Sequence, residues 1–429
     1  MSLALPLPRV LRHRDFRLLW LAGSASSVGD RIVTVAIAIF VVQLTGSATD
    51  VGLVLAAYLI PLVAFLLVGG VVADRLPRHR LAVATDVVRC LLHGLLAVLI
   101  VTGEVRIWQM IAIGILFGTA EAFFRPAASG LLPQTVPEDD IQEATAATIM
   151  AHNVAELAGP ALATALVLGF SPAAAFGLDA ATFLLSAALL VRVRPRERGA
   201  PAVHREAGSS VRADLRDGYR EVRSRAWVWA TLVAFSVALL TVLAPLFVVG
   251  PLVAEERYGD IAVFGFALAA FGGGTVAGSL AALRWRPRYP LRRAMACALL
   301  WPASIGLFAA GLPLELVVPA MAVGGAGIAL FDVWWVTALA ERIPPDKLSR
   351  VTAYDWAVSF GLMPVGLLLA GPAAHALGAT SVLLGGAVVA IAALAIGLVP
   401  RETRMLARLD VPSAPGTLML ADAHDLPAA

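Results

Sequence analysis

The sequence predicts an all-α membrane protein with twelve transmembrane helices, and three observations lead to this fold class. Hydrophobic residues make up 59% of the chain and charged residues 15%, against about 25% charged residues in a typical soluble domain. Apolar runs of roughly 20 residues, the length that crosses a bilayer, recur along the whole chain. Positive charge gathers in alternate loops between these runs, as it does in multi-pass membrane proteins.

The predicted spans begin directly after a basic N-terminal segment. Arg9, Arg12 and Arg14 precede a long apolar run without a small-residue cleavage site, so we expect an uncleaved first helix rather than a signal peptide. The apolar runs place the twelve helices at 17–42, 51–73, 81–102, 107–131, 142–169, 172–191, 227–253, 261–283, 293–312, 315–340, 350–371 and 378–399.

The lysines and arginines predict how these helices are oriented. Only Arg106 and Arg257 fall in one set of loops, whereas almost all of the other 31 lie in the opposite set. This second set comprises the N-terminal segment, the 74–80 turn, the 192–226 linker, the 284–293 and 341–350 turns and the C-terminal tail. Because cytoplasmic loops carry the excess of Lys and Arg, both termini are expected in the cytoplasm.

The 192–226 linker divides the chain into two parts of six helices each. It is rich in Arg, Gly, Pro and Ser and turns amphipathic from about Ser210 to Arg225, so we expect a helix on the cytoplasmic membrane surface. The predicted organisation is an N-terminal six-helix bundle at 1–191, the cytoplasmic linker, a C-terminal six-helix bundle at 227–400 and a disordered cytoplasmic tail at 401–429.

The two parts look like repeats of one another. The segment 124–139 resembles the segment 331–346, and each joins a helix with a buried charge to a Pro-Asp turn and a further helix. Two related, pseudo-symmetric bundles around a site near the bilayer midplane are typical of secondary transporters.

The segment 69–80, between the second and third spans, predicts a tight cytoplasmic turn. Asp74 ends the second helix, where it can accept hydrogen bonds from a facing helix N-terminus and from Arg75 or Arg78. Such a charge-assisted lock could close one state of a transporter and open in another. The alternative is that these arginines only set the topology.

Charged residues within the spans are the candidate transport site, because each costs about 2.5–3.5 kcal/mol at the bilayer centre on insertion scales. Asp30 and Arg31 lie at the middle of the first helix, about 100° apart, so they are unable to satisfy each other fully. Glu121 and Arg125 share a helix face at i, i+4 and could simply form an internal ion pair.

Other intramembrane residues have both a structural and a functional interpretation. Glu156 lies close before Gly159 and Pro160 in the fifth helix, and Asp332 occupies the position in the repeat that corresponds to Arg125. Asp179 either bonds a neighbouring helix or takes part in transport. We expect Asp86, Arg89 and His93 to form a structural network, with the first two reaching the cytoplasmic face; Trp334 and Trp335 either line a cavity or anchor at the interface.

A carboxylate in a low-dielectric cavity can hold and release a proton near neutral pH. Competition between a proton and a substrate for Asp30, Glu121 or Glu156 would give antiport. Acids outnumber bases within the spans, which favours protons together with neutral or cationic substrates.

Several other classes of protein are disfavoured. The pI near 9.2 follows from the loop arginines, so it does not indicate nucleic-acid binding. Cys90 and Cys297 both lie in apolar runs and predict neither a disulfide framework nor a metal site. The chain has no His-Glu-x-x-His, Gly-x-Ser-x-Gly or P-loop motif, so we expect neither an intramembrane enzyme nor a bound cofactor.

The chain resembles the major facilitator superfamily. The family's loop signature, Gly-x-x-x-Asp-Arg/Lys-x-Gly-x-Arg/Lys-Arg/Lys, is matched by Gly70, Asp74, Arg75 and Arg80. Pro77 and His79 depart from it, at positions where the family has a glycine and a cation.

A narrower resemblance is to the macrolide-efflux and enterobactin-type siderophore exporters. It rests on Leu-Thr-Gly-Ser-Ala at 44–48, Phe-Arg-Pro-Ala at 124–127, Leu-Leu-Pro-Gln-Thr-Val-Pro at 131–137 and Gly-Pro-Ala-Leu at 159–162. Gly159 and Pro160 resemble the helix-five motif of drug/proton antiporters, although Ala163 stands where a glycine is usual.

This resemblance implies the major facilitator fold and efflux of a small amphipathic molecule by alternating access. The molecule would be a drug, an antibiotic or a siderophore-like metabolite, and the proton gradient would supply the energy without a cofactor. The resemblance also implies a monomer in the bacterial inner membrane. A proton- or cation-coupled importer on the same fold stays open, because the direction of transport cannot be read from the residues.

Overall fold

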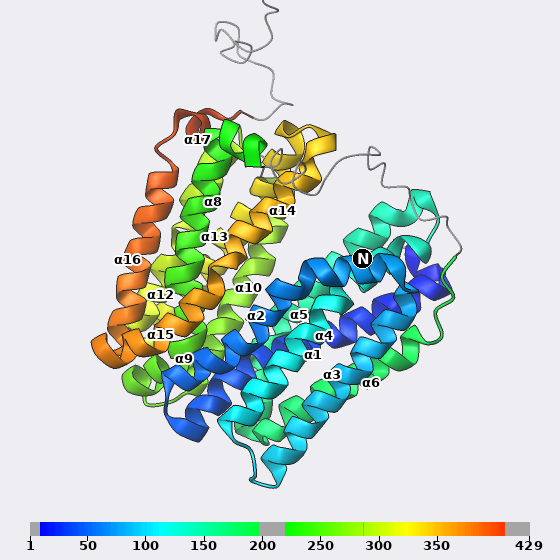
Figure 1. Cartoon of the computed structure of the whole chain (residues 1–429). Coiled ribbons are helices and arrows are strands. Elements are labelled where there is room, and N and C mark those ends of the chain that lie inside the picture. The colour runs from blue at the N-terminus through cyan, green and yellow to red at the C-terminus, as the bar shows by residue number, and fades with distance from the viewer. Residues whose placement is uncertain (1–8, 197–218, 286, 408–429) are drawn as a thin grey trace, which may run out of the picture.

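The computed structural model describes residues 9–196, 219–285 and 287–407, and it contains helices but no β-strand within these ranges (Figure 1). Ten helical segments are long and apolar enough to cross a membrane. The prediction of a helical, multi-pass membrane protein is therefore confirmed. The first half contains α1 (Arg14–Thr45), α2 (Ala48–Arg75), α3 (Arg78–Val101), α4 (Ile107–Leu131), α5 (Ile141–Gly169) and α6 (Pro172–Leu190).

The second half follows the predicted order with more interruptions. Its helices are α8 (Ala226–Ala238), α9 (Ala244–Tyr258), α10 (Ala262–Arg284), α11 (Pro290–Ala298), α12 (Leu300–Ala309), α13 (Leu314–Arg342), α14 (Pro345–Gly361), α15 (Met363–Leu377), α16 (Ala379–Gly397) and the short α17 (Arg401–Met405). One π-helical turn, at Leu239–Leu243, joins α8 to α9. Short 3-10 turns cover Arg9–Arg12, Leu132–Gln134 and Glu138–Asp140.

Two of the twelve predicted spans are not among the ten candidate spans. The predicted span 142–169 is a single helix, α5, which carries the polar His152 and Glu156. The predicted span 293–312 is divided into α11 and α12 at Leu299. Helices thus cover both segments, but neither meets the criteria of length and hydropathy that the other ten meet.

Local sequence explains where several helices begin and end. Gly46 ends α1 in the left-handed region at φ 66°, which favours glycine. Ser47 then caps α2 by accepting a hydrogen bond from the backbone N–H of Asp50. Ser171 caps α6 in the same way, with Pro172 at the first helical position.

Two expectations about the later helices are corrected. The predicted span 350–371 ends too early, because α15 runs on to Leu377 with Pro372 inside it. Disorder from residue 401 onward is wrong for Arg401–Met405, which form α17 with Thr403 fully buried. The remainder of the predicted tail, from 408, lies outside the described residues, as does most of the predicted surface helix of the linker.

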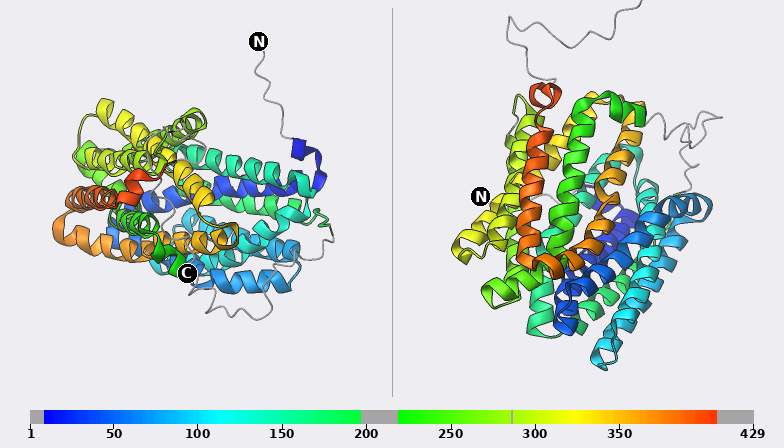
Figure 2. Two further views of the ribbon diagram at one scale, coloured as in Figure 1. Left: turned by 90° about the horizontal axis from the view of Figure 1, so that it is seen from above. Right: turned by 60° about the vertical axis from the view of Figure 1, so that its left-hand side comes forward.

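The helices pack in two groups, which Figures 1 and 2 show from different sides. In the first group α4 packs on α2, and α6 packs on both α1 and α3. In the second group α13 packs on α10, α11 and α12, and α16 packs on α8 and α12. The close approach of α10 to α13 uses the small-residue pair Gly274 and Gly278, whose Cα atoms face the backbone of Ala322 and Ala326.

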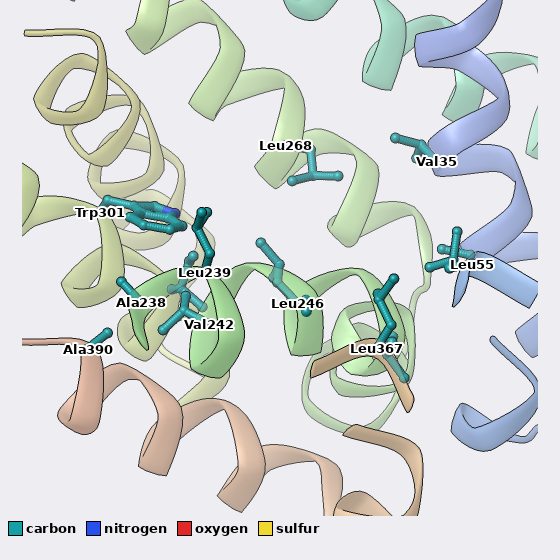
Figure 3. Packing of buried hydrophobic residues seen from close by; sticks show 14 of the residues in the cluster. Val35, Leu55, Ala238, Leu239, Val242, Leu246, Leu268, Trp301, Leu367 and Ala390 are labelled. Carbon is teal, nitrogen blue, oxygen red and sulfur yellow. The ribbon is translucent and has the colours of Figure 1, made fainter. Parts of the chain in front are cut away.

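The two groups meet at the end of the molecule away from the linker. The most extensive contacts between them join α5 to α10 and α2 to α15. Glycine allows both approaches: a Cβ at Gly52 would collide with the carbonyl oxygen of Leu367, and one at Gly265 with the hydroxyl of Thr164. Figure 3 shows buried side chains of both groups in this region, among them Leu55 from α2 and Leu367 from α15.

The last turn of the linker is attached to the second group. Residues 219–224 are helical, and Glu221 accepts hydrogen bonds from Arg225 (Nη2 to Oε1, 2.8 Å) and from Lys347 at the start of α14 (Nζ to Oε2, 3.0 Å). Burial alone would raise the pKa of Glu221, but the donors Lys347 and Arg225 outweigh it and hold this pKa below its ordinary value. The contact is therefore present above the ordinary carboxylate pKa and is lost as the pH falls through the lowered one.

Candidate functional site

A buried charged network joins α3, α4 and α6 in the middle of the first group. The guanidinium of Arg89 donates to the carboxylates of Asp86 and Glu121, and none of these three side chains is more than 7% exposed. Ser186 on α6 donates its hydroxyl to Asp86 over 2.6 Å. The predicted pair of Glu121 with Arg125 is present, with 2.9 Å between Arg125 Nε and Glu121 Oε1. Each charge therefore meets an opposite charge, with Arg89, Asp86 and Glu121 buried and Arg125 about half exposed.

The expectation that Asp86 and Arg89 reach the cytoplasmic face is wrong. Both side chains are fully buried. Phe124 and Phe183 enclose the guanidinium of Arg89, with ring centroids 3.9 and 4.3 Å from its Cζ. Of the predicted network, the contact of Asp86 with Arg89 is confirmed, whereas His93 bonds Asp179 on α6 instead.

A second ion pair joins α1 to α5. Arg31 Nη2 lies 2.7 Å from Glu156 Oε1, and each side chain is about half exposed. One turn earlier on both helices, Ser27 Oγ lies 2.7 Å from His152 Nδ1. The helices can approach because a Cβ at Gly159 would collide with the Cβ of Arg31.

The glycine-proline motif of the fifth helix lies in this contact. Pro160 stands inside α5, which is helical from Ile141 to Gly169 without interruption. In the structure the glycine thus provides a close helix–helix contact rather than a break in α5.

Charge balance singles out two carboxylates of the first group. Among the intramembrane residues, Arg31 pairs with Glu156, and Arg89 and Arg125 neutralise Asp86 and Glu121. This leaves Asp30 and Asp179 without an arginine. Asp179 forms a hydrogen bond with Nδ1 of His93. Within the described ranges, the Asp30 carboxylate has no hydrogen-bond or ion-pair partner, although Thr34 donates to the backbone carbonyl of Asp30.

Asp30 opens onto a cavity of about 80 Å³ between α1, α2, α3 and α4. Most of its wall is apolar, including Leu55, Ile113 and Phe117. Its polar groups are Asp30, Thr34, Tyr58 and His93. One water needs roughly 10–15 Å³ of such space and two to four polar partners, so the cavity can hold several waters at its polar end.

Asp332 is the predicted site residue of the second group. Its side chain is exposed on α13 and makes no hydrogen bond within the described residues. Asp355, on α14, accepts a hydrogen bond from the indole of Trp335 over 3.0 Å.

Both tryptophans of α13 are buried inside the second group of helices. Trp334 is 2% exposed and Trp335 is 5% exposed. Trp334 packs edge-on against Trp285, and Trp335 packs against Trp227 and Phe331. Of the two interpretations that the sequence left open, cavity lining is therefore wrong for these two residues.

The charged turn after α2 is attached to its own group of helices. Arg78 Nη1 donates to the carbonyl oxygen of Gly130 at the end of α4 over 2.7 Å. Gly70 lies within α2, where a Cβ would meet nothing within 4 Å, and Arg75 and Arg80 are exposed. Asp74 lies in the last turn of α2, and its side chain is outside the described part of the structure.

Sequence reasoning missed three polar residues near these charges, namely Ser27, Tyr58 and His152. Ser27 and His152 lie one turn before Arg31 and Glu156, so helical spacing could have indicated them. Tyr58 gave no such signal, because a single tyrosine in an apolar run is as often an ordinary packing residue. Among the described residues, no three His, Cys, Asp or Glu side chains come together as a metal site would require.

Comparison with known proteins agrees with this arrangement. The family described as transmembrane secretion effector matches residues 8–417. The macrolide efflux protein A of Streptococcus pyogenes is 21% identical over 85% of this chain and 90% of its own length. The multidrug efflux pump Tap of Mycolicibacterium fortuitum is 25% identical over 93% of this chain and 98% of its own. An uncharacterized MFS-type transporter, YfiS of Bacillus subtilis, is 27% identical over 43% of each chain.

Solved structures show the same fold. The crystal structure of the nucleoside transporter NupG superposes with a TM-score of 0.69, covering 89% of this chain and 98% of that one at 15% sequence identity. At this identity the likeness concerns the fold alone. The family match extends over nearly the whole chain, and the chain therefore belongs to the transmembrane secretion effector family of major facilitator transporters.

Proposed function

We propose that this transporter is a proton-coupled efflux protein, which exchanges protons for a small amphipathic molecule such as a drug, an antibiotic or a siderophore-like metabolite. The observation that carries the proposal is the Asp30 carboxylate, which lies in the middle of α1, opens onto a cavity and has no partner within the described residues. An unpaired carboxylate at this depth is neutralised either by a proton or by a cationic group. The names of the two efflux relatives support outward transport.

The proposed architecture is the twelve-helix major facilitator fold, with six-helix bundles at 1–191 and 227–400 related by pseudo-symmetry. The linker at 192–226 and both termini lie in the cytoplasm, and the protein is a monomer in a bacterial inner membrane. The arginine-rich loops on one side support this orientation. The packing of α1–α6 and of α8–α16 as two groups supports the two bundles.

The proposed conformation is inward-open. The bundles touch at the end away from the linker, through α2 with α15 and α5 with α10. The side chains of the Arg31–Glu156 pair are about half exposed, and Asp332 is exposed. In the alternate state these contacts separate and the cytoplasmic ends close, so that the same charges face the opposite side.

The proposed exchange takes place at Asp30, with Glu156 and Asp332 as charged walls of the cargo path. A proton on Asp30 removes the unpaired charge and allows the empty site to reorient. Cargo binding from the cytoplasm displaces this proton, which leaves toward the cytoplasm. Glu121 and Arg125 stabilise the adjacent helices through their pair, and Arg125 remains half exposed toward the same space.

The charged turn at Gly70, Asp74, Arg75, Arg78 and Arg80 is the proposed cytoplasmic gate. Arg78 is anchored on α4 in the structure. When the cytoplasmic ends approach, the exposed Arg75 and Arg80 come within reach of the opposite bundle, which would favour the closed state electrostatically.

Reconstituted protein tests this function directly. We expect proteoliposomes with an acidic lumen to accumulate ethidium, whose fixed charge prevents passive trapping, and nigericin to abolish this accumulation. Asp30→Asn and Glu156→Gln should each abolish the gradient-driven part, whereas the exposed carboxylate variant Glu315→Gln should not. Exchange of radiolabelled erythromycin at equal pH should persist in Asp30→Asn.

Three results would contradict the proposal. Flux that is equal with and without the pH gradient would exclude proton coupling. Accumulation driven by an alkaline lumen would instead support an importer on the same fold. Unchanged gradient-driven accumulation in both Asp30→Asn and Glu156→Gln would remove the site assignment.

A further inference from the structure

The His93–Asp179 pair lies next to the part of α1 that carries Asp30. Unlike the other intramembrane ion pairs of the first group, it contains no arginine. Asp179 on α6 is fully buried, and its Oδ2 is hydrogen-bonded to Nδ1 of His93 on α3. Phe117 stacks on the imidazole with ring centroids 4.0 Å apart and an angle of 7°, and Phe176 meets the same ring edge-on. The imidazole is therefore held in one plane by apolar neighbours.

The surroundings of the His93–Asp179 pair leave the charge of Asp179 without a cationic hydrogen-bond partner. The charged groups that face the pair are Arg89 and Asp86, from the same helix as His93, and Glu121 from α4. Arg89 donates from its two terminal nitrogens to Asp86 and Glu121, and its Nε has no hydrogen-bond partner among the described residues. From α1, the backbone of Gly29 packs directly against the Asp179 carboxylate, and Asp30 is the next residue. From α2, Tyr58 lines the shared cavity; from α6 itself, Thr182 Oγ1 lies 3.4 Å from Asp179 Oδ1.

Nε2, the second ring nitrogen of His93, is the point at which a proton could reach the His93–Asp179 pair. His93 lines the same cavity as Asp30. His93 is almost buried, at 5% exposure, and within the described ranges its Nε2 has no hydrogen-bond partner. Water at the polar end of the cavity can therefore reach both Asp30 and Nε2.

We propose that His93 and Asp179 together form a second exchangeable proton site, filled from Asp30, so that two protons move for each cargo molecule. This rests on the proposed proton coupling. In the empty state Asp179 is ionised and accepts from Nδ1–H, while Nε2 carries no proton. Filling transfers a proton from the Asp30 carboxyl through cavity water to Nε2, and the Nδ1 proton moves to Asp179. Histidine stays neutral and changes tautomer, Asp179 becomes neutral, and Asp30 is free to take up another proton.

The tautomer of His93 can be observed without any cargo. In detergent-purified protein with ¹⁵N-labelled histidine, the His93 signals, assigned as those lost in His93→Gln, should change from the Nδ1–H to the Nε2–H pattern as the pH falls from about 9 to about 5. Asp179→Asn keeps an acceptor oxygen for Nδ1–H but cannot take a proton, so this variant should show the Nδ1–H pattern at every pH. His375→Gln, at an exposed position on α15, is the matched control and should leave the His93 signals unchanged.

Transport measurements give the second readout. With the electrical potential clamped to zero, a gradient of one pH unit should sustain an ethidium ratio of about 100-fold in the wild type and about 10-fold in Asp179→Asn, because each proton contributes one factor of ten. A single tautomer of His93 across the pH range, or an equal ratio in wild type and Asp179→Asn, would overturn the second site even if proton coupling is confirmed. A tautomer change together with gradient-independent flux would instead retain the proton site and refute the proposed function.

Discussion

At the residue scale, the charges of the first group differ in how completely they are neutralised. Arg89 is enclosed with both of its acids, whereas the Arg31–Glu156 pair is half exposed. Asp30 has no partner in the described part of the chain. A sealed network suits a structural role, and an accessible, unbalanced carboxylate suits exchange, because only the latter can change its charge without leaving a buried ion unpaired.

Removing Arg89 should therefore destabilise the protein more than removing Arg31. Arg89→Met leaves Asp86 and Glu121 without their shared donor, and we expect a loss of about 3–5 kcal/mol in the free energy of unfolding. Arg31→Met breaks a half-exposed pair and should cost less than about 1 kcal/mol. Thermal unfolding of both variants in detergent measures the difference, and similar melting temperatures would show that the Arg89 network is not what holds α3, α4 and α6 together.

Residue types and spacing predicted part of this site. Glu121 and Arg125 share one helix, so their pairing follows from i, i+4 geometry alone. The partners of Arg31 and of His93 lie on other helices, far away in the sequence. Those pairings depend on how α1, α3, α5 and α6 are rotated against one another, which a single sequence does not state.

At the element scale, glycines determine where the two groups of helices touch. Gly371 on α15 lies against the backbone of Thr49, and Gly52 on α2 lies against the carbonyl of Leu367, so each crossing depends on a missing side chain. The glycine pair of α10 acts differently, because Gly274 and Gly278 pack within the second group.

Adding side chains at the first two glycines should disfavour the contact between the groups. Overpacking costs about 1–3 kcal/mol in the conformation that contains the contact. This cost changes the equilibrium constant between the two conformations by about 5- to 150-fold. We expect Gly371→Val or Gly52→Val to reduce cytoplasmic labelling of a cysteine placed at Val336, one turn after Asp332, in a protein whose Cys90 and Cys297 have been replaced by serine.

A glycine with free space around it provides the control for this experiment. A Cβ added at Gly385 on α16 would meet nothing within 4 Å, so Gly385→Ala should leave the labelling of the Val336 cysteine unchanged. Equal labelling in the wild type and in the Gly371 and Gly52 variants would show that these contacts do not bias the conformation.

At the scale of the whole molecule, the loops between helices should alternate between the two sides of the membrane. Glu104, between α3 and α4, and Asp139, between α4 and α5, are both exposed and lie at opposite ends of α4. In intact cells a membrane-impermeant maleimide should label Glu104→Cys and not Asp139→Cys, and inside-out vesicles should show the reverse. Labelling of both or of the opposite residue in intact cells would refute cytoplasmic termini.

The sequence by itself determined the class of protein, the order of its membrane helices and which loops carry the positive charge. Each of these depends on properties of a local stretch of chain, namely hydropathy over a span and charge in a loop. Family motifs along nearly the whole chain then identified the superfamily, as the family match confirms.

Only the tertiary structure decided which charges meet and which stay alone. It placed Asp86 and Arg89 inside the protein instead of at its surface, buried Trp334 and Trp335, and brought His93 to Asp179. It also left Asp30 without a partner, among the described residues, beside a cavity. The physical reason is that the free energy of a charge in a membrane protein depends on the neighbours that other helices supply, and these neighbours are set by packing over long distances in the chain.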